Sequence, residues 1–347
     1  MSATFISSCT TKQPVTKFRN TKIEYNSDVG NLMDVIKAYW QDDRKHAAPN
    51  TAIPVQQIDP VFLTQGQEDA VYRLGHSTIL LRLDGEFILL DPMFSERAFP
   101  VQWMGPKRFH QPPISIEALP AIKAVIISHD HYDHLDKQAI KALKDKVETF
   151  ITPLQVGQHL REWGVPNDKI TELDWWQETR LETIRITATP AQHFSGRGLF
   201  DRDHTLWASW VIQGWDSKVF FSGDTGYFDG FKEIGEKFGP FDITLMETGA
   251  YNEHWTDIHM MPEQSLQAHI DLKGKVMVPI HNGTFDLSLH DWFEPLARIQ
   301  QLADENQVQI RTPVFGAELA IRAPAATAKW WLETGTETNI KPLLVSD

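Results

Sequence analysis

The feature that most constrains this chain is a short segment in which a buried strand is followed at once by a dense group of histidines and aspartates. Residues 121–128 (AIKAVIIS) are apolar and rich in β-branched side chains, a pattern typical of a strand inside a sheet. The next residues, 129–134, read HDHYDH, and helical spacing follows over residues 136–144. Imidazole is the commonest metal ligand in proteins, and carboxylates add negative charge for a second ion. The segment therefore predicts a metal site at the end of a strand.

The order of the other elements predicts a layered α+β sandwich. Residues 77–83 and 86–91 flank the turn pair Asp84-Gly85, which indicates a β-hairpin. Strand patterns follow over residues 147–151, 181–189, 207–213, 218–222, 242–247, 276–280 and 318–321. Helical patterns cover residues 154–163, 228–238, 262–271 and 292–304. Because hairpins come first and strand–helix units follow, a sandwich of mixed sheets suits the chain better than a doubly wound parallel sheet.

We expect one catalytic domain over residues 56–323, preceded by a leader with a short helix over 1–55 and followed by a polar tail over 324–347. A domain of this size buries enough apolar surface to be stable without disulfides. The single cysteine, Cys9, has no partner for an internal bridge. Any metal site must therefore use His, Asp or Glu.

The net charge and the hydropathy indicate where the protein works. A formal charge of −13 disfavours binding to nucleic acid, whose partners neutralise phosphates with Lys and Arg. No apolar run approaches the ~18–20 residues of a spanning helix, so we expect a cytoplasmic or peripheral membrane protein. The alternative, if the start of the chain is truncated, is a lipid anchor on Cys9, because Ile6 to Cys9 resembles the end of a lipoprotein signal. Against it, only five residues precede Ile6, and a signal needs an apolar stretch of ~7–15 residues.

Three further polar residues follow strand patterns elsewhere in the chain. His193 comes after residues 181–189, Asp224 lies in the GDTG turn after 218–222, and His281 follows 276–280. Functional side chains of α/β sheets collect at the carboxyl ends of strands. Each residue alone would more often have a structural role, but their shared position favours a common metal site.

The ordered set of HxHxDH, a lone His, an Asp in GDTG and a last His resembles the metallo-β-lactamase superfamily. This resemblance implies an αββα sandwich. It also implies that one metal is held by His129, His131 and His193, and a second by Asp133, His134 and His281, with Asp224 bridging both. Asp91, at the end of the hairpin, matches the early aspartate that orients such sites.

Between about Val71 and Pro295 the chain is also similar to the family of N-acylphosphatidylethanolamine-hydrolysing phospholipases D. The stretches GPKRF, DWW, GDTGY, FGPFD and GAY carry this resemblance. His259 resembles a family histidine near the metals, so the candidate catalytic residues are Asp133, Asp224 and His259. Three residues depart from the animal enzymes: Phe194 stands where they have Trp, and Glu247-Thr248 stands where they have less polar residues.

The resemblance implies a hydrolase with two zinc ions, for which iron and manganese are the alternatives. Two adjacent ions lower the pKa of a bridging water and polarise a phosphoryl oxygen. The expected substrate is N-acylphosphatidylethanolamine, cleaved to N-acylethanolamine and phosphatidic acid, and the expected partners are this phospholipid or another small ester, a membrane surface and a second copy of the chain. A lactonase of the same superfamily is the alternative. A metal-bearing fold without activity and a nucleic-acid-processing relative fit less well, because the ligand set is complete and the chain is acidic.

Overall fold

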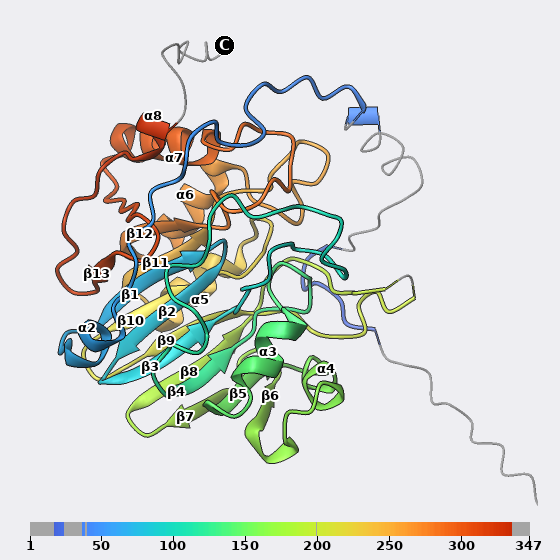
Figure 1. The fold of residues 1–347 in the computed structure, drawn as a ribbon, viewed down its shortest axis with the longest axis vertical. Helices are drawn as coiled ribbons and strands as arrows, with labels where there is room; N and C mark the ends of the chain where they lie inside the picture. The colour runs from blue at the N-terminus through green and yellow to red at the C-terminus, as the bar shows by residue number, and fades with distance from the viewer. Residues whose placement is uncertain (1–16, 24–36, 39, 199, 335–347) are drawn as a thin grey trace, which may run out of the picture.

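The computed structural model describes residues 17–23, 37–38, 40–198 and 200–334. Two β-sheets pack face to face, and helices cover their outer faces (Figure 1). This four-layer arrangement confirms the predicted α+β sandwich. Its element order, with antiparallel strands first and strand–helix units after them, follows the order seen in the sequence.

The first sheet has seven strands in the order β13-β1-β2-β3-β4-β5-β6. Neighbouring strands from β13 to β3 are antiparallel, and neighbouring strands from β3 to β6 are parallel. Their bounds are β1 (Ala70–Gly75), β2 (Thr78–Leu83), β3 (Glu86–Leu90), β4 (Ile122–Ile126), β5 (Val147–Pro153), β6 (Ile170–Leu173) and β13 (Glu318–Ala320). The predicted hairpin is β2–β3, whereas β1 and β6 were not predicted.

The second sheet has six strands in the order β12-β11-β10-β9-β8-β7, of which β10, β11 and β12 are parallel. Their bounds are β7 (Glu178–Leu181), β8 (Ile184–Thr189), β9 (Ser209–Gln213), β10 (Lys218–Phe221), β11 (Phe241–Glu247) and β12 (Gly274–Ile280). The prediction of one continuous strand over 181–189 is wrong. The chain turns at Glu182, whose φ is 55°, so residues 178–189 form an antiparallel pair.

Most of the described helices follow strands and were predicted with small shifts in their bounds, whereas the helices over 60–65 and 331–334 were not predicted. The helices are α2 (Pro60–Gln65), α3 (Lys137–Leu143), α4 (Gly157–Glu162), α5 (Gly230–Phe238), α6 (Pro262–Asp271), α7 (Glu294–Glu305) and α8 (Trp331–Thr334), with a 3₁₀ turn at Asn167–Lys169. The bounds of α6 agree with the prediction because proline starts its first turn. The helix α4 begins later than predicted because Gln155, with φ of 70°, interrupts the helical backbone.

Alternate residues of each strand point into different cores, which explains the continuous apolar strands. On β2, Ile79 and Leu81 join the cluster between the two sheets, whereas Leu80 packs toward α3 and α4. A third cluster joins the second sheet to α5, α6 and α7. Because both faces of both sheets are covered, polar side chains gather in the loops at the strand ends.

The ends of the described chain add three observations. The short helix expected in the leader, over residues 31–45, lies largely outside the described residues, and Cys9 lies wholly outside them. Trp330 and Trp331 are buried in a cluster with Trp292 and Phe315, so the segment after residue 324 packs on the domain. Among the described helices, none has both the length and the apolarity that a membrane span requires.

Candidate metal centre

The loops that carry the candidate ligands converge from both sheets. Residues 129–134 follow β4 of the first sheet, while His193, Asp224 and His281 follow β8, β10 and β12 of the second. The two sheets stack face to face, so the loops at these strand ends meet at one edge of the sandwich. The structure thereby brings together all seven residues of the expected ligand set, in two neighbouring groups.

The first group contains His129, His131, His193 and Asp224. One ligand atom of each lies within 4.8 Å of the others. The Nδ1 atom of His131 is 2.9 Å from Nε2 of His129 and 3.2 Å from Nε2 of His193. All three imidazoles therefore direct a ring nitrogen at a common point, as a tetrahedral metal site requires.

The second group contains Asp133, His134, His281 and an additional residue, His76. The Oδ2 atom of Asp133 is 3.3 Å from Nε2 of His281 and 3.4 Å from Nε2 of His134. The same oxygen lies 3.0 Å from Nε2 of His76. The sequence analysis missed His76, although it too is a polar residue directly after a strand, β1.

Asp224 lies between the two groups. Its Oδ2 atom is 3.1 Å from Nε2 of both His134 and His281. It is 3.8 Å from Nε2 of His129 and 3.9 Å from Nε2 of His193. Within the described chain, Oδ1 of Asp224 is buried without a hydrogen-bond partner, and the buried Nε2 atoms of His134 and His281 contact Asp224 without forming a hydrogen bond of good geometry. Since buried polar atoms are rarely left unpaired, these donor atoms fit metal ions as their missing partners.

Buried groups behind the ligands set their orientation. Asp91 is fully buried, and its Oδ2 lies 2.7 Å from Nδ1 of His134, while its Oδ1 accepts the N–H of Ser128 at 2.7 Å. The Nδ1 atom of His193 lies 3.0 Å from the carbonyl oxygen of Ile258. Each contact places the proton on Nδ1 and leaves Nε2 free to bind a metal. Asp91 thus occupies the orienting position expected from the resemblance.

His259 lies beside the same centre, together with a carboxylate that the sequence analysis did not assign. Its ring centroid is 5.2 Å from that of His193 and 5.5 Å from that of His281. Its Nδ1 contacts Oε1 of Glu247, the last residue of β11, which is fully buried. The other oxygen of Glu247 accepts the N–H of Thr225 at 2.7 Å. Glu247 could have been found by the signal that was used for Asp224, namely a polar residue at the end of an apolar strand.

Comparison with known proteins decides the family. A family model described as the Beta-lactamase superfamily domain matches residues 86–282, more than half of the chain. The chain belongs to this superfamily. It is a metallo-hydrolase with candidate His and Asp metal sites. The structure is similar to that of an isothiocyanate hydrolase from Delia radicum gut bacteria, with a TM-score of 0.58 at 22% identity over 72% of this chain and 98% of that one. This structural similarity supports the assignment of the sandwich fold.

Two relatives narrow the resemblance within the superfamily. An uncharacterised protein of Mycobacterium tuberculosis is 43% identical over 297 residues, which covers 84% of this chain and 80% of the relative. The N-acyl-phosphatidylethanolamine-hydrolyzing phospholipase D 1 of Caenorhabditis elegans is 36% identical over 248 residues, or 67% of this chain and 69% of the enzyme. The similarity to phospholipases D noted from the sequence motifs is therefore confirmed.

Burial and mutual contacts shift the pKa values of this superfamily site in opposite directions. Burial opposes the ionisation of Asp224, yet His134 and His281 hold its pKa well below the usual range. Burial also opposes protonation of His281, but the carboxylates of Asp224 and Asp133 raise its pKa to about 10. Burial lowers the pKa of His129 far below its ordinary value. The contacts within the site therefore favour protonated imidazoles at some positions and ionised carboxylates beside them.

The neighbouring pair, Glu247 and His259, carries less charge than the ligand groups. Burial raises the pKa of Glu247 well above its usual range, and the charge of Asp224 acts in the same direction. Burial lowers the pKa of His259 to about 4. At neutral pH the imidazole of His259 is thus uncharged and can both accept and donate a proton.

Proposed function

We propose that the protein is a two-metal phosphodiesterase that cleaves N-acylphosphatidylethanolamine to N-acylethanolamine and phosphatidic acid. The observation that carries the proposal is the position of Asp224, whose Oδ2 lies between two groups of histidines. A carboxylate shared in this way is the expected arrangement for two ions that act on the attacking and the leaving oxygen of one phosphodiester. The similarity to the phospholipase D of Caenorhabditis elegans supports the choice of substrate.

The proposed ligands are His129, His131 and His193 for one ion and Asp133, His134 and His281 for the other, with Asp224 shared. When bound, the two ions would supply an activated water and a Lewis acid for the phosphoryl oxygen. Imidazole and carboxylate donors favour zinc, and iron or manganese would also accept this ligand set.

The side chain of His259 would serve the leaving group. Its Nδ1 is held by Glu247, which leaves Nε2 as the nitrogen that exchanges a proton with substrate. Burial lowers the pKa of His259 to about 4 and raises that of Glu247 well above its usual range, so at pH 7 the protonated carboxyl of Glu247 donates to Nδ1 and Nε2 carries the proton that passes to the leaving alkoxide. Glu247 orients this ring from the side opposite to the substrate. A positioned acid of this kind contributes roughly 10²–10⁴-fold to the rate.

A groove beside the metal-binding segment supports an amphipathic, anionic substrate. Its volume is about 300 Å³, and it lies between the start of α3, the loop after β3 and Arg197. Its walls combine apolar side chains (Met93, Phe99 and Trp163) with the cations Arg97, Lys137 and Arg197 and the single carboxylate of Asp136. Acyl chains would pack against the apolar side chains, and a phosphate would bind the cations.

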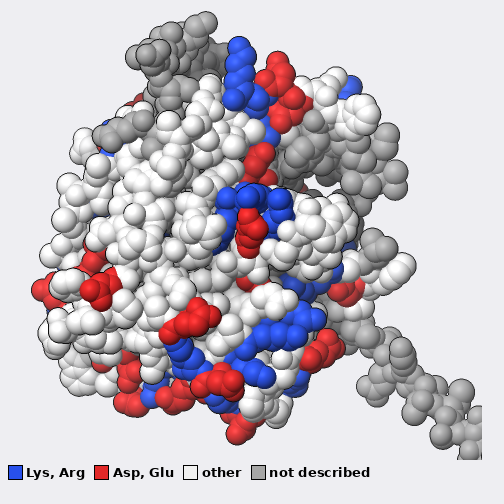
Figure 2. All heavy atoms as spheres, in the orientation of Figure 1, with Lys and Arg blue, Asp and Glu red and all other residues white. Residues whose placement is uncertain are grey.

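Exposed apolar side chains lie on two loops that adjoin this groove. Trp103 is 78% exposed and Met104 43% in the loop after β3, and Phe200 is 90% exposed in the loop between β8 and β9. Figure 2 shows broad uncharged areas on the face drawn, with acidic and basic side chains next to one another rather than in one basic track. Exposed aromatic side chains suit contact with a lipid surface, where part of each ring can leave water.

The test is product analysis with metal-loaded enzyme on N-acylphosphatidylethanolamine, beside a panel of lactones. We expect N-acylethanolamine as a product, and kcat/KM should rise with N-acyl chain length, because each buried CH₂ contributes about 0.8 kcal/mol. The Asp224→Ala variant is the control for contaminating activity. Rapid turnover of lactones without any N-acylethanolamine would contradict the phospholipase assignment and leave the metallo-hydrolase.

A further inference from the structure

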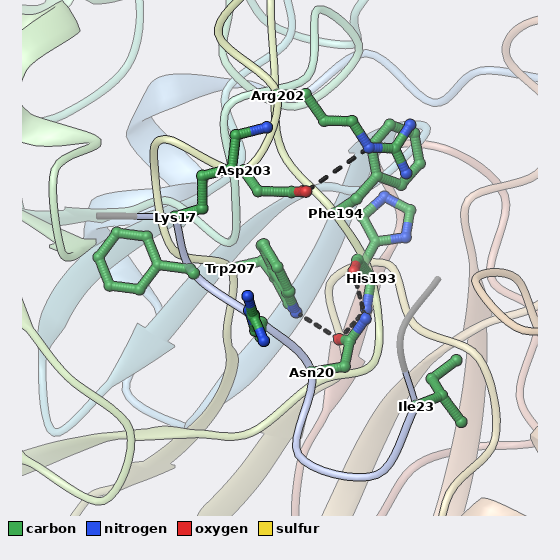
Figure 3. Close-up of a pocket in the computed structure, with 10 residues that line it drawn as sticks. Lys17, Asn20, Ile23, His193, Phe194, Arg202, Asp203 and Trp207 are labelled. Carbon is green, nitrogen blue, oxygen red and sulfur yellow. Dashed lines mark hydrogen bonds and ion pairs between the residues drawn. The ribbon is translucent and has the colours of Figure 1, made fainter. Parts of the chain in front are cut away.

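A residue from the N-terminal segment clamps the backbone of one metal-ligand candidate. Asn20 donates from Nδ2 to the carbonyl oxygen of His193 at 2.9 Å, and its Oδ1 accepts the N–H of His193 at 3.0 Å. The same Oδ1 accepts the indole N–H of Trp207 at 3.1 Å. Figure 3 shows Asn20 between His193 and Trp207, with these contacts drawn. One side chain thus satisfies both backbone groups of a residue 173 positions away.

The loop after β8 depends on such contacts because His193 lies beyond the end of the strand ladder, which stops at Thr189. The preceding residue, Gln192, is held through its backbone by Thr225 and Gly226. The ring of His193 is held by the carbonyl oxygen of Ile258. The backbone of His193 itself is held by Asn20, whose amide acts in place of a neighbouring strand.

We propose that Asn20 is a positioning residue for His193, and that the segment 17–23 is therefore part of the metal centre. The inference rests on the proposed role of His193 as a ligand of one metal. An asparagine suits the task because its amide offers one donor and one acceptor side by side. Without it, a buried N–H and a buried C=O of the loop lose their partners, and the loop relaxes away from the ring position that the metal requires.

The rest of the segment keeps Asn20 in place. The N–H of Phe18 donates to the carbonyl oxygen of Asp203 at 2.9 Å, which ties the segment to the loop between β8 and β9. Lys17, Phe18, Asn20 and Ile23 line a cavity of about 260 Å³ together with His193, Phe194 and Trp207 (Figure 3). The N-terminal segment therefore forms one wall of a hollow that reaches His193.

Coupling between the clamp and the metal is reciprocal. If the docked Asn20 strengthens metal binding at His193, metal binding must stabilise the docked segment by the same factor. The amide of Phe18 should consequently exchange its hydrogen more slowly after the metal is added. This consequence is independent of any substrate.

The experiment uses the full-length protein, stripped with a chelator and titrated with cobalt(II) against a competing chelator. Asn20→Ala should bind one of the two cobalt ions about 10–100-fold more weakly than wild type, the usual effect of removing a group that orients a ligand. The visible absorption of the bound cobalt should change as well. The matched control is Thr327→Val, which removes a side-chain bond to the backbone N–H of Thr312 at 2.8 Å, also between a terminal segment and the domain. It should lower Tm and leave cobalt affinity unchanged.

A second variant keeps the test decisive if Asn20→Ala folds poorly. Asn20→Asp has the same shape and keeps both acceptor contacts, but it sets a carboxylate oxygen against the carbonyl of His193. It should fold, bind cobalt more weakly and lose the metal-dependent protection of residues 17–23 from hydrogen exchange. Wild-type cobalt affinity and spectrum in both variants, with only Tm lowered as in Thr327→Val, would overturn the proposal. Since no substrate is used, failure of the phospholipase assignment would leave these outcomes unchanged.

Discussion

The carboxylate of Glu247 contacts Nδ1 of His259 at the edge of the metal centre, within a ligand-like group that also includes Asp224 and His281. Glu247 is fully buried at the end of β11, while the side chain of His259 keeps 14% of its exposure. The buried Glu247 therefore orients the more exposed His259. The pair has the geometry of a buried carboxyl group that holds an imidazole for proton transfer.

The first prediction concerns this pair. With a chromogenic phosphodiester as reporter, His259→Ala should lower kcat about 10²–10⁴-fold, because the proton donor is lost. Glu247→Ala should cost about 10–100-fold, the usual effect of removing an orienting group. The double variant should be no slower than His259→Ala alone, since residues that act as a unit are not additive. All three variants should retain both metals in elemental analysis, and loss of a metal or additive rate effects would contradict the assignment.

The second prediction concerns Asp224. Wild-type protein should carry close to two metal ions per chain, and a strong chelator should abolish hydrolysis. Asp224→Ala should lose bound metal and nearly all activity, because the oxygen that lies between both histidine groups is removed. Asp216→Ala is the control, since Asp216 is 64% exposed and pairs with Arg322 on the surface. Elemental analysis that finds two metals in Asp224→Ala would refute the shared position.

The third prediction tests the orientation of His134. In Asp91→Asn the amide oxygen can still accept the N–H of Ser128, which turns its NH₂ group toward Nδ1 of His134. The proton of the imidazole is then forced onto Nε2, the atom that should bind metal. We expect metal affinity to fall about 10–100-fold with little change in circular dichroism. Competition with a chromophoric chelator measures this, and unchanged affinity would show that the tautomer does not matter.

The fourth prediction follows from the raised pKa values of His134 and His281. In metal-free protein the nearby carboxylates hold the pKa of His281 at about 10 and that of His134 well above its usual value, despite burial. Both rings are therefore protonated at pH 7, whereas a metal binds only the neutral ring. Zinc binding should release about two protons per chain, and affinity should increase as the pH rises from 6 toward 9. Calorimetry in buffers with different ionisation enthalpies counts these protons, and binding without release would contradict the protonated state.

Local pattern was sufficient to predict much of the fold and of the site. The run of β-branched residues before HDHYDH predicted β4 with its ligand turn, and the proline at position 262 placed the start of α6 correctly. The turn pair Asp84-Gly85 placed the hairpin β2–β3. These features depend on interactions within a few residues, so the sequence alone contains them. The strand β7 was missed because its residues alternate between exposed and half-buried, which leaves little apolar signal.

Tertiary structure alone decided which distant residues complete the centre. His76 and Glu247 each look like an ordinary polar residue at a strand end, and Asn20 lies in a polar segment without any periodic pattern. Their roles arise when loops from two sheets and the N-terminal segment meet at one edge of the sandwich. A hydrogen bond to His193 from 173 positions away leaves no mark on the spacing of nearby residues. The amino-acid sequence thus determined the chemistry of the ligands, and the packing of the sheets determined which buried groups hold them in place.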